Sequence, residues 1–149
     1  MQSRFAPVFS PYELLELGVF DGSYYRADNP DLQETATITE KNLFAEGASH
    51  PLRVWQEKGW ITAEDPMGWF QWYTRYYHGR RLPELDRHQI KRQQSFVARH
   101  GAQVKKSGAG DINKRRKQRQ SLLHWAADPI PDIEVDNKLD YLRQLRNVE

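Results

Sequence analysis

Residues 69–81 read W-F-Q-W-Y-T-R-Y-Y-H-G-R-R, and this stretch decides the fold that we expect for the chain. At about 100° per residue, its six Trp, Tyr and Phe rings fall within an arc of about 160°. A broad aromatic face of this kind is typical of a helix that packs into a hydrophobic core. The alternative is a platform on which nucleic-acid bases stack, for which the candidates are Trp69, Trp72, Tyr73 and Tyr77.

The sequence on either side of this stretch predicts further helices. Ser10-Pro11 followed by leucines and Gly18 indicates a short capped helix, and Asp65-Pro66 can begin the aromatic one. Other helices are expected over Leu52–Lys58, Glu84–His100, a segment capped by Asp111 or Asn113, and Asp136–Asn147. Residues 21–49 are rich in small polar residues and predict irregular structure or one short strand. We therefore expect a mainly α, compact single-domain helical fold with an irregular N-terminal segment.

Charge divides the chain into three segments. Residues 1–65 carry 5 Lys and Arg against 11 Asp and Glu, residues 66–127 carry 14 against 3, and residues 128–149 carry 3 against 6. We interpret residues 1–127 as one helical domain with an acidic and a basic part. Residues 128–149 are an acidic, proline-stiffened linker followed by an amphipathic helix. That tail could dock on its own domain, swap to a partner subunit, or shield the basic part.

The basic part carries most of the candidate ligand contacts. No Asp or Glu interrupts Arg87 to Gly110, which favours an anion-binding face over a solvated face of mixed charge. Lys105 to Asp111 reads as a flexible basic loop, although it lacks the order of residues found in a Walker phosphate loop. Arg80 and Arg81 either contact a ligand or pair with an acid of the N-terminal segment. The phosphate-binding candidates are Arg75, Arg80, Arg81, Arg87, Lys91, Arg92, Lys105, Lys106, Arg115, Arg116 and Arg119.

Signs of catalysis are sparse in this sequence. The chain has no cysteine, and its histidines lack the spacing of a metal-binding helix, so we expect no metal site and no cofactor. If a reaction is catalysed, the candidates for proton transfer are Asp86, Asp111 and His88. Whether the protein is an enzyme stays open.

Tryptophans, glycines and arginines stand at fixed offsets in the middle of the chain. They occur in Trp60-Ile61, Asp65-Pro66, Gly68-Trp69-Phe70, Trp72-Tyr73, Arg75-Tyr76-Tyr77 and Gly79-Arg80-Arg81. This block resembles an uncharacterised family of small proteins that share a GWI, DP, GWF, WY, R, YY, GRR pattern. Gly18-Val19-Phe20 and the later Leu122-Leu123 with Trp125 resemble flanking parts of that family. The resemblance covers nearly the whole chain and implies no established activity.

Clustered guanidinium groups beside bulky rings favour nucleic acid as the partner, with DNA ahead of RNA. Two alternatives remain open: an enzyme that modifies or processes nucleic acid or a nucleotide, and an adaptor that binds an acidic protein. The absence of cysteine favours a cytoplasmic location, and no segment approaches the roughly 18 apolar residues of a membrane span. The sequence does not indicate an oligomeric state.

Overall fold

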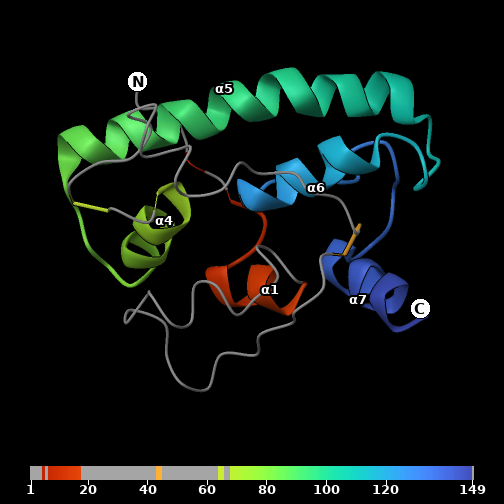
Figure 1. The fold of residues 1–149 in the computed structure, drawn as a ribbon, viewed down its shortest axis with the longest axis horizontal. Helices are drawn as coiled ribbons and strands as arrows, with labels where there is room; N and C mark the ends of the chain where they lie inside the picture. The colour runs from red at the N-terminus through yellow and green to blue at the C-terminus, as the bar shows by residue number, and fades with distance from the viewer. Residues whose placement is uncertain (1–4, 6, 18–42, 45–63, 66–67, 149) are drawn as a thin grey trace.

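The structure is a computed structural model that describes residue 5 and residues 7–17, 43–44, 64–65 and 68–148. The described residues form α-helices and contain no β-strand, which confirms the expected mainly α class. Helix α5 lies along one edge of the molecule, α4 and α6 lie beneath it, and α1 and α7 lie beyond them (Figure 1). The helix expected over Leu52–Lys58 lies outside the described residues, as does the segment 21–49 apart from Leu43 and Phe44.

Helix α1 (Pro11–Glu16) forms where the sequence predicts a capped helix. The Ser10 hydroxyl accepts a hydrogen bond from the Glu13 amide at 3.1 Å, and the Glu13 carboxylate accepts one from the Ser10 amide at 2.8 Å. This reciprocal capping box satisfies two amides that the first helical turn leaves unpaired. Leu14 and Leu15 face the core and are fully buried.

Helix α4 (Trp69–Tyr77) is the aromatic helix, and it begins later than the sequence suggests. The expectation that Asp65 caps it and that Pro66 opens it is wrong, because the N-cap residue is Gly68. Gly68 has φ 98°, a left-handed conformation that glycine adopts without steric cost. The Asp65 carboxylate is engaged by two arginine side chains instead of the first turn of the helix.

The rings of α4 form the centre of the hydrophobic core. Trp69, Phe70, Trp72 and Tyr73 are all at most 2% exposed and pack with leucines of α1. The polar atoms of the buried rings have partners: the Trp72 indole donates to Asp86 at 2.8 Å, and the Tyr73 hydroxyl donates to the Phe9 carbonyl at 2.5 Å. The core interpretation of this helix is therefore confirmed, because its rings are buried without leaving unpaired donors.

Helix α5 (Pro83–Gly108) is longer than expected, and the predicted basic loop from Lys105 is wrong over its first four residues. Lys105 and Lys106 occupy the last helical turn, where cations complement the negative end of the helix dipole. Val104 is fully buried one turn from the end, so packing continues the helix to Gly108.

Helix α6 (Arg116–His124) also differs from the prediction at its start. Neither Asp111 nor Asn113 caps it, because the N-cap residue is Arg115 in a left-handed conformation, with φ 59°. The Asp111 carboxylate instead accepts a hydrogen bond from the Asn113 amide at 2.9 Å and closes a local turn. Two of the expected helical cations, Lys114 and Arg115, therefore precede the helix.

The acidic tail packs on the core of the molecule. Helix α7 (Lys138–Val148) places Leu142 in the same buried cluster as the α4 rings, and Ile130 of the preceding linker joins it. Arg143 also pairs with Glu16 of α1 at 2.5 Å. Helix α7 lies on the side of the molecule away from α5 (Figure 1).

Candidate nucleic-acid interface

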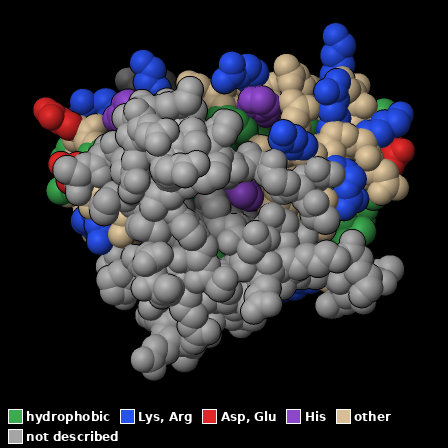
Figure 2. All heavy atoms as spheres, viewed as in Figure 1, with side chains coloured by type: hydrophobic (Ala, Val, Ile, Leu, Met, Phe, Trp, Pro, Cys, Tyr) green, Lys and Arg blue, Asp and Glu red, His purple; other side chains and the backbone are tan. Residues whose placement is uncertain are grey.

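The outward side of α5 carries cations with no acid among them from Arg87 to Lys106. The helix has 26 residues and therefore spans about 39 Å. Its exposed cations fall within an arc of about 120°, opposite the residues that it buries. Figure 2 shows Lys and Arg side chains along the edge of the molecule that α5 forms. The exposed cations are Arg87, Lys91, Arg99, Lys105 and Lys106.

An open groove lies where this row meets the end of α6. Its volume is about 440 Å³, and Trp125, the residue that ends α6, lies beside it. The α5 residues that line it follow one another at alternating intervals of three positions and one, so they form one stripe of the helix. They are His88, Lys91, Arg92, Ser95, Phe96 and Arg99. The groove therefore combines cations with two large rings.

The rings of the groove belong to a stacked column that is joined to the core. His100 stacks on Phe96 with 4.2 Å between ring centroids, and Phe96 stacks on Trp125 at 5.3 Å. Trp125 in turn contacts Trp69 of the core at 5.1 Å, and its carbonyl accepts a hydrogen bond from Gln93 at 3.1 Å. These contacts hold the rings in place before any ligand arrives, which lowers the entropy lost on binding.

Arg92 connects the row of cations to the rings. Its guanidinium lies 5.5 Å from the centroid of the Trp125 ring and donates a hydrogen bond to the Gln89 side chain at 2.9 Å. Burial lowers the pKa of Arg92, but an arginine stays charged at neutral pH because its ordinary pKa exceeds 12. A positive charge is thus held above an aromatic face.

A second basic groove lies at the start of α6, with a volume of about 490 Å³. Arg116 on its rim donates to the Phe44 carbonyl at 2.8 Å, whereas Arg115 and Lys117 are exposed. Gln118, which also lines this groove, hydrogen-bonds the His100 ring at 3.1 Å, and His100 stacks on Phe96 of the first groove. Burial, and then the charge of Arg99, lower the pKa of His100, so this ring is neutral near pH 7.

Three of the candidate arginines lie at the corner between α4 and α5. The Asp65 side chain is fully buried and accepts hydrogen bonds from Arg80 at 2.7 and 3.0 Å and from Arg75 at 3.0 Å. For Arg80, the sequence left open ligand contact or pairing with an acid of the N-terminal segment. The hydrogen bonds to Asp65 are a pairing of the second kind. Arg81 lies 3.7 Å from the Tyr76 ring centroid and donates to the Tyr76 carbonyl. None of these arginines lines either groove.

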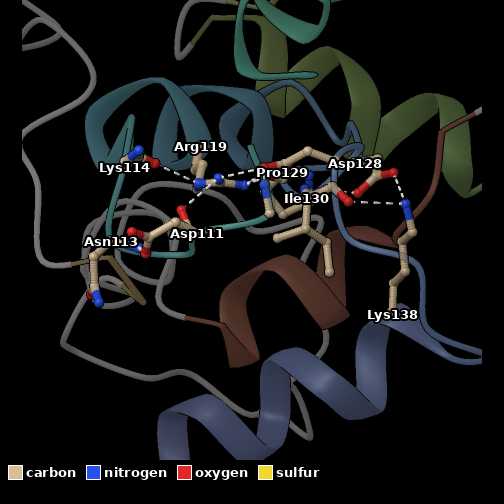
Figure 3. Close-up of polar contacts among 10 residues, drawn as sticks. Asp111, Asn113, Lys114, Arg119, Asp128, Pro129, Ile130 and Lys138 are labelled. Carbon is tan, nitrogen blue, oxygen red and sulfur yellow. Dashed lines mark hydrogen bonds and ion pairs between the residues drawn. The ribbon is translucent and has the colours of Figure 1, made fainter. Parts of the chain in front are cut away.

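Arg119 lies inside the protein and holds a network of acceptors (Figure 3). Its side chain is 0% exposed and forms two hydrogen bonds of 2.8 Å with the carboxylate of Asp132. Its remaining N–H groups donate to the carbonyls of Lys114, Pro129 and Asp111. All five guanidinium donors are therefore used within the protein, and we leave Arg119 out of the interface.

Of the four stacking candidates, only Tyr77 reaches the surface, with 52% of its area exposed. The groove instead presents Phe96 and Trp125, which are not among the stacking candidates. A signal for Phe96 does exist, because Arg92 and Arg99 lie four and three positions away on the same side of the helix. The sequence does not indicate that α6 brings Trp125 beside them.

The candidates for proton transfer do not lie together. His88 lines the first groove, whereas the Asp86 carboxylate is buried and accepts hydrogen bonds from the Trp72 indole and the Leu82 amide, each at 2.8 Å. Asp111 lies in the turn before α6. The described residues also include no cluster of three or more His, Asp or Glu side chains that could hold a metal ion.

Comparison with protein-family models, curated proteins and solved structures finds no match to this chain. The resemblance drawn from the Trp, Gly and Arg block therefore stays a prediction, and the function has to be argued from the site. No helix in the described part of the chain combines the length and the apolar character needed to cross a membrane.

Proposed function

We propose that this protein binds nucleic acid through the outer face of α5, with the groove beside Trp125 at its centre. The observation that carries the proposal is that cations and rings meet in one groove: exposed Lys91 and Arg99 line it together with the half-buried rings of Phe96 and Trp125. Phosphates supply the charge that such cations attract, and bases supply the flat faces that such rings contact.

The chemistry of the groove favours this ligand over the alternatives. Among the described residues that line it there is no carboxylate and one histidine, His88, so a reaction has little support. An acidic protein would satisfy the cations but would leave the stacked rings without a matching flat partner. We keep DNA as the first ligand to test, and the absence of cysteine supports the cytoplasmic location that we expect.

The test measures the affinity for labelled 20-nucleotide DNA and RNA, single-stranded and double-stranded, by fluorescence anisotropy at about 50 and 200 mM salt. With about four phosphates contacted on a single strand, affinity should fall about 50-fold between these concentrations. The double variant Lys91→Gln/Arg99→Gln should bind at least tenfold more weakly than the wild type at the lower salt concentration.

A matched control removes the same charge away from the groove. Arg81→Gln/Arg143→Gln also lowers the net charge by two, and these arginines lie at the α4–α5 corner and on α7. This control should keep most of the affinity. Absence of binding to every nucleic acid at about 50 mM salt would overturn the proposal, as would an equal loss in the two double variants.

A further inference from the structure

We infer that the groove beside Trp125 seats an unpaired base, so that the ligand is a single strand and not a duplex. This inference rests on the proposed function and adds the form of nucleic acid that the site selects. It follows from the position of the rings, the size of the groove and the distance between Arg92 and Trp125.

The ring column leaves one place for a base. Phe96 already stacks with two rings, with His100 at 4.2 Å and with Trp125 at 5.3 Å between ring centroids. Trp125 contacts Phe96 and Trp69, and it also lines the open groove, where Arg92 lies over its ring. A base that enters the groove therefore meets the Trp125 ring beneath Arg92.

The distance between Arg92 and Trp125 suits this arrangement. Arg81 lies 3.7 Å from the Tyr76 ring centroid, which is direct contact, whereas Arg92 lies 5.5 Å from that of Trp125. A flat base between a guanidinium and a ring needs about 7 Å, since each contact takes about 3.5 Å. Arg92 has to move outward by about 1.5 Å, a movement that gives up its hydrogen bond to Gln89.

The size of the groove separates a single strand from a duplex. A volume of about 440 Å³ is in the range of a site for one small flat molecule. In a duplex the bases are paired and stacked inside the helix, so a duplex can touch the cations of α5 but cannot present a base face to Trp125.

The cations beside the groove lie where the phosphates of a seated base would pass. Lys91 and Arg99 are eight residues apart on α5, a separation of about 12 Å along the helix. Phosphates along one strand repeat at about 3.4 Å of helix axis in a duplex and further apart when the strand is extended, so this distance spans at least two phosphates. A base can thus enter the groove while the phosphates on either side of it meet Lys91 and Arg99.

The experiment changes the ligand before it changes the protein. Three ligands are compared at about 50 mM salt: a 20-mer of thymidine, a 20-mer with the same phosphates and abasic sugars, and a blunt duplex of 20 base pairs. Stacking of one base on an aromatic ring is worth a factor of at least five, so the thymidine strand should bind at least fivefold more tightly than both others. The abasic strand should keep the salt dependence of the thymidine strand.

Substitutions of Trp125 and Arg92 then test whether these residues cause the difference in affinity between the ligands. Trp125→Leu should remove the difference between the thymidine and abasic strands, and Trp125→Phe should restore part of it. Arg92→Gln should reduce the same difference while the melting temperature stays close to that of the wild type, which keeps the test valid if Trp125→Leu fails to fold.

The outcomes separate this inference from the proposed function. Equal affinity for the three ligands, or tighter binding of the duplex, would overturn the inference and leave nucleic-acid binding intact. No binding to any of them would overturn both. Polyglutamate of equal charge that binds as tightly as the thymidine strand would also overturn both, because the groove would then select charge alone.

Discussion

Replacing Asp132 by asparagine tests the buried ion pair that joins the tail linker to α6. The carboxylate of Asp132 is 3% exposed and accepts two hydrogen bonds from the fully buried Arg119. The substitution keeps the size of the side chain but removes its charge and turns one acceptor into a donor. Arg119 is then left as a buried cation with no counter-charge.

The expected loss of unfolding free energy is about 3 to 5 kcal/mol, the usual cost of removing one partner from a buried ion pair. For a chain of this length, that loss corresponds to a melting temperature lower by about 10 °C or more. Thermal melts followed by circular dichroism at pH 7 give the value directly. Asp132→Asn should melt in one cooperative step, because the core around α4 is not altered.

The matched control is Asp128→Asn, the same change four residues earlier. Asp128 pairs with Lys138, but both side chains are about one-quarter exposed, so the loss should be about 0 to 1 kcal/mol. The Ile130 amide keeps an acceptor in the asparagine. Equal losses in the two variants, or a loss below about 1 kcal/mol for Asp132→Asn, would refute the reasoning.

The pH dependence of the same ion pair has a definite sign. The hydrogen bonds from Arg119 hold the pKa of Asp132 below its ordinary value, although burial acts in the opposite direction. The contribution of this group to stability is therefore complete at neutral pH and is lost as the pH falls below about 4. Asp132→Asn should remove this part of the acid sensitivity.

Three further predictions concern other parts of the fold. Gly108→Ala should be strongly destabilising, because the added Cβ would lie 2.5 Å from atoms of the buried ion pair. At Gly101 the nearest atom would lie 3.9 Å from the added Cβ, so Gly101→Ala should raise the unfolding free energy by about 0.5 to 1 kcal/mol. Chemical denaturation of both variants gives the comparison. Arg80→Gln should cost about 3 kcal/mol, because the fully buried Asp65 loses two hydrogen bonds, and a melt like that of the wild type would count against this. Burial lowers the pKa of His124 to about 3. The folded state, which keeps this ring neutral, should therefore lose stability steadily as the pH falls below about 6.5, where the unfolded chain takes up the proton. NMR titration should show no protonation of His124 near pH 5.

The sequence was sufficient to predict which helix faces are apolar and form the core. The periodicity of Trp69, Trp72 and Tyr73 identified an apolar helix face, and the capping signal around Ser10 located α1, because both features depend on residues close together in the chain. The amphipathic pattern of Asp136–Asn147 likewise predicted a tail helix, and Leu142 of α7 is buried in the core.

What the sequence could not supply is the pairing of residues that are distant in the chain. Asp65 has the appearance of a helix cap, but guanidinium groups ten and fifteen residues later occupy its oxygens. Arg119 belongs to a basic run, yet the linker carries a carboxylate to it and the pair is buried. Trp125 reaches the groove only because α6 packs along α5.

The central claim, that the face of α5 beside Trp125 holds nucleic acid, is tested most directly by NMR titration of isotope-labelled protein with a 20-mer of thymidine. The account predicts that the largest shift changes fall on the amides of residues 88–99 and on the indole N–H of Trp125, while those of α7 stay unchanged. Shift changes centred on α7 or on the α4–α5 corner, or none at saturating ligand, would contradict it.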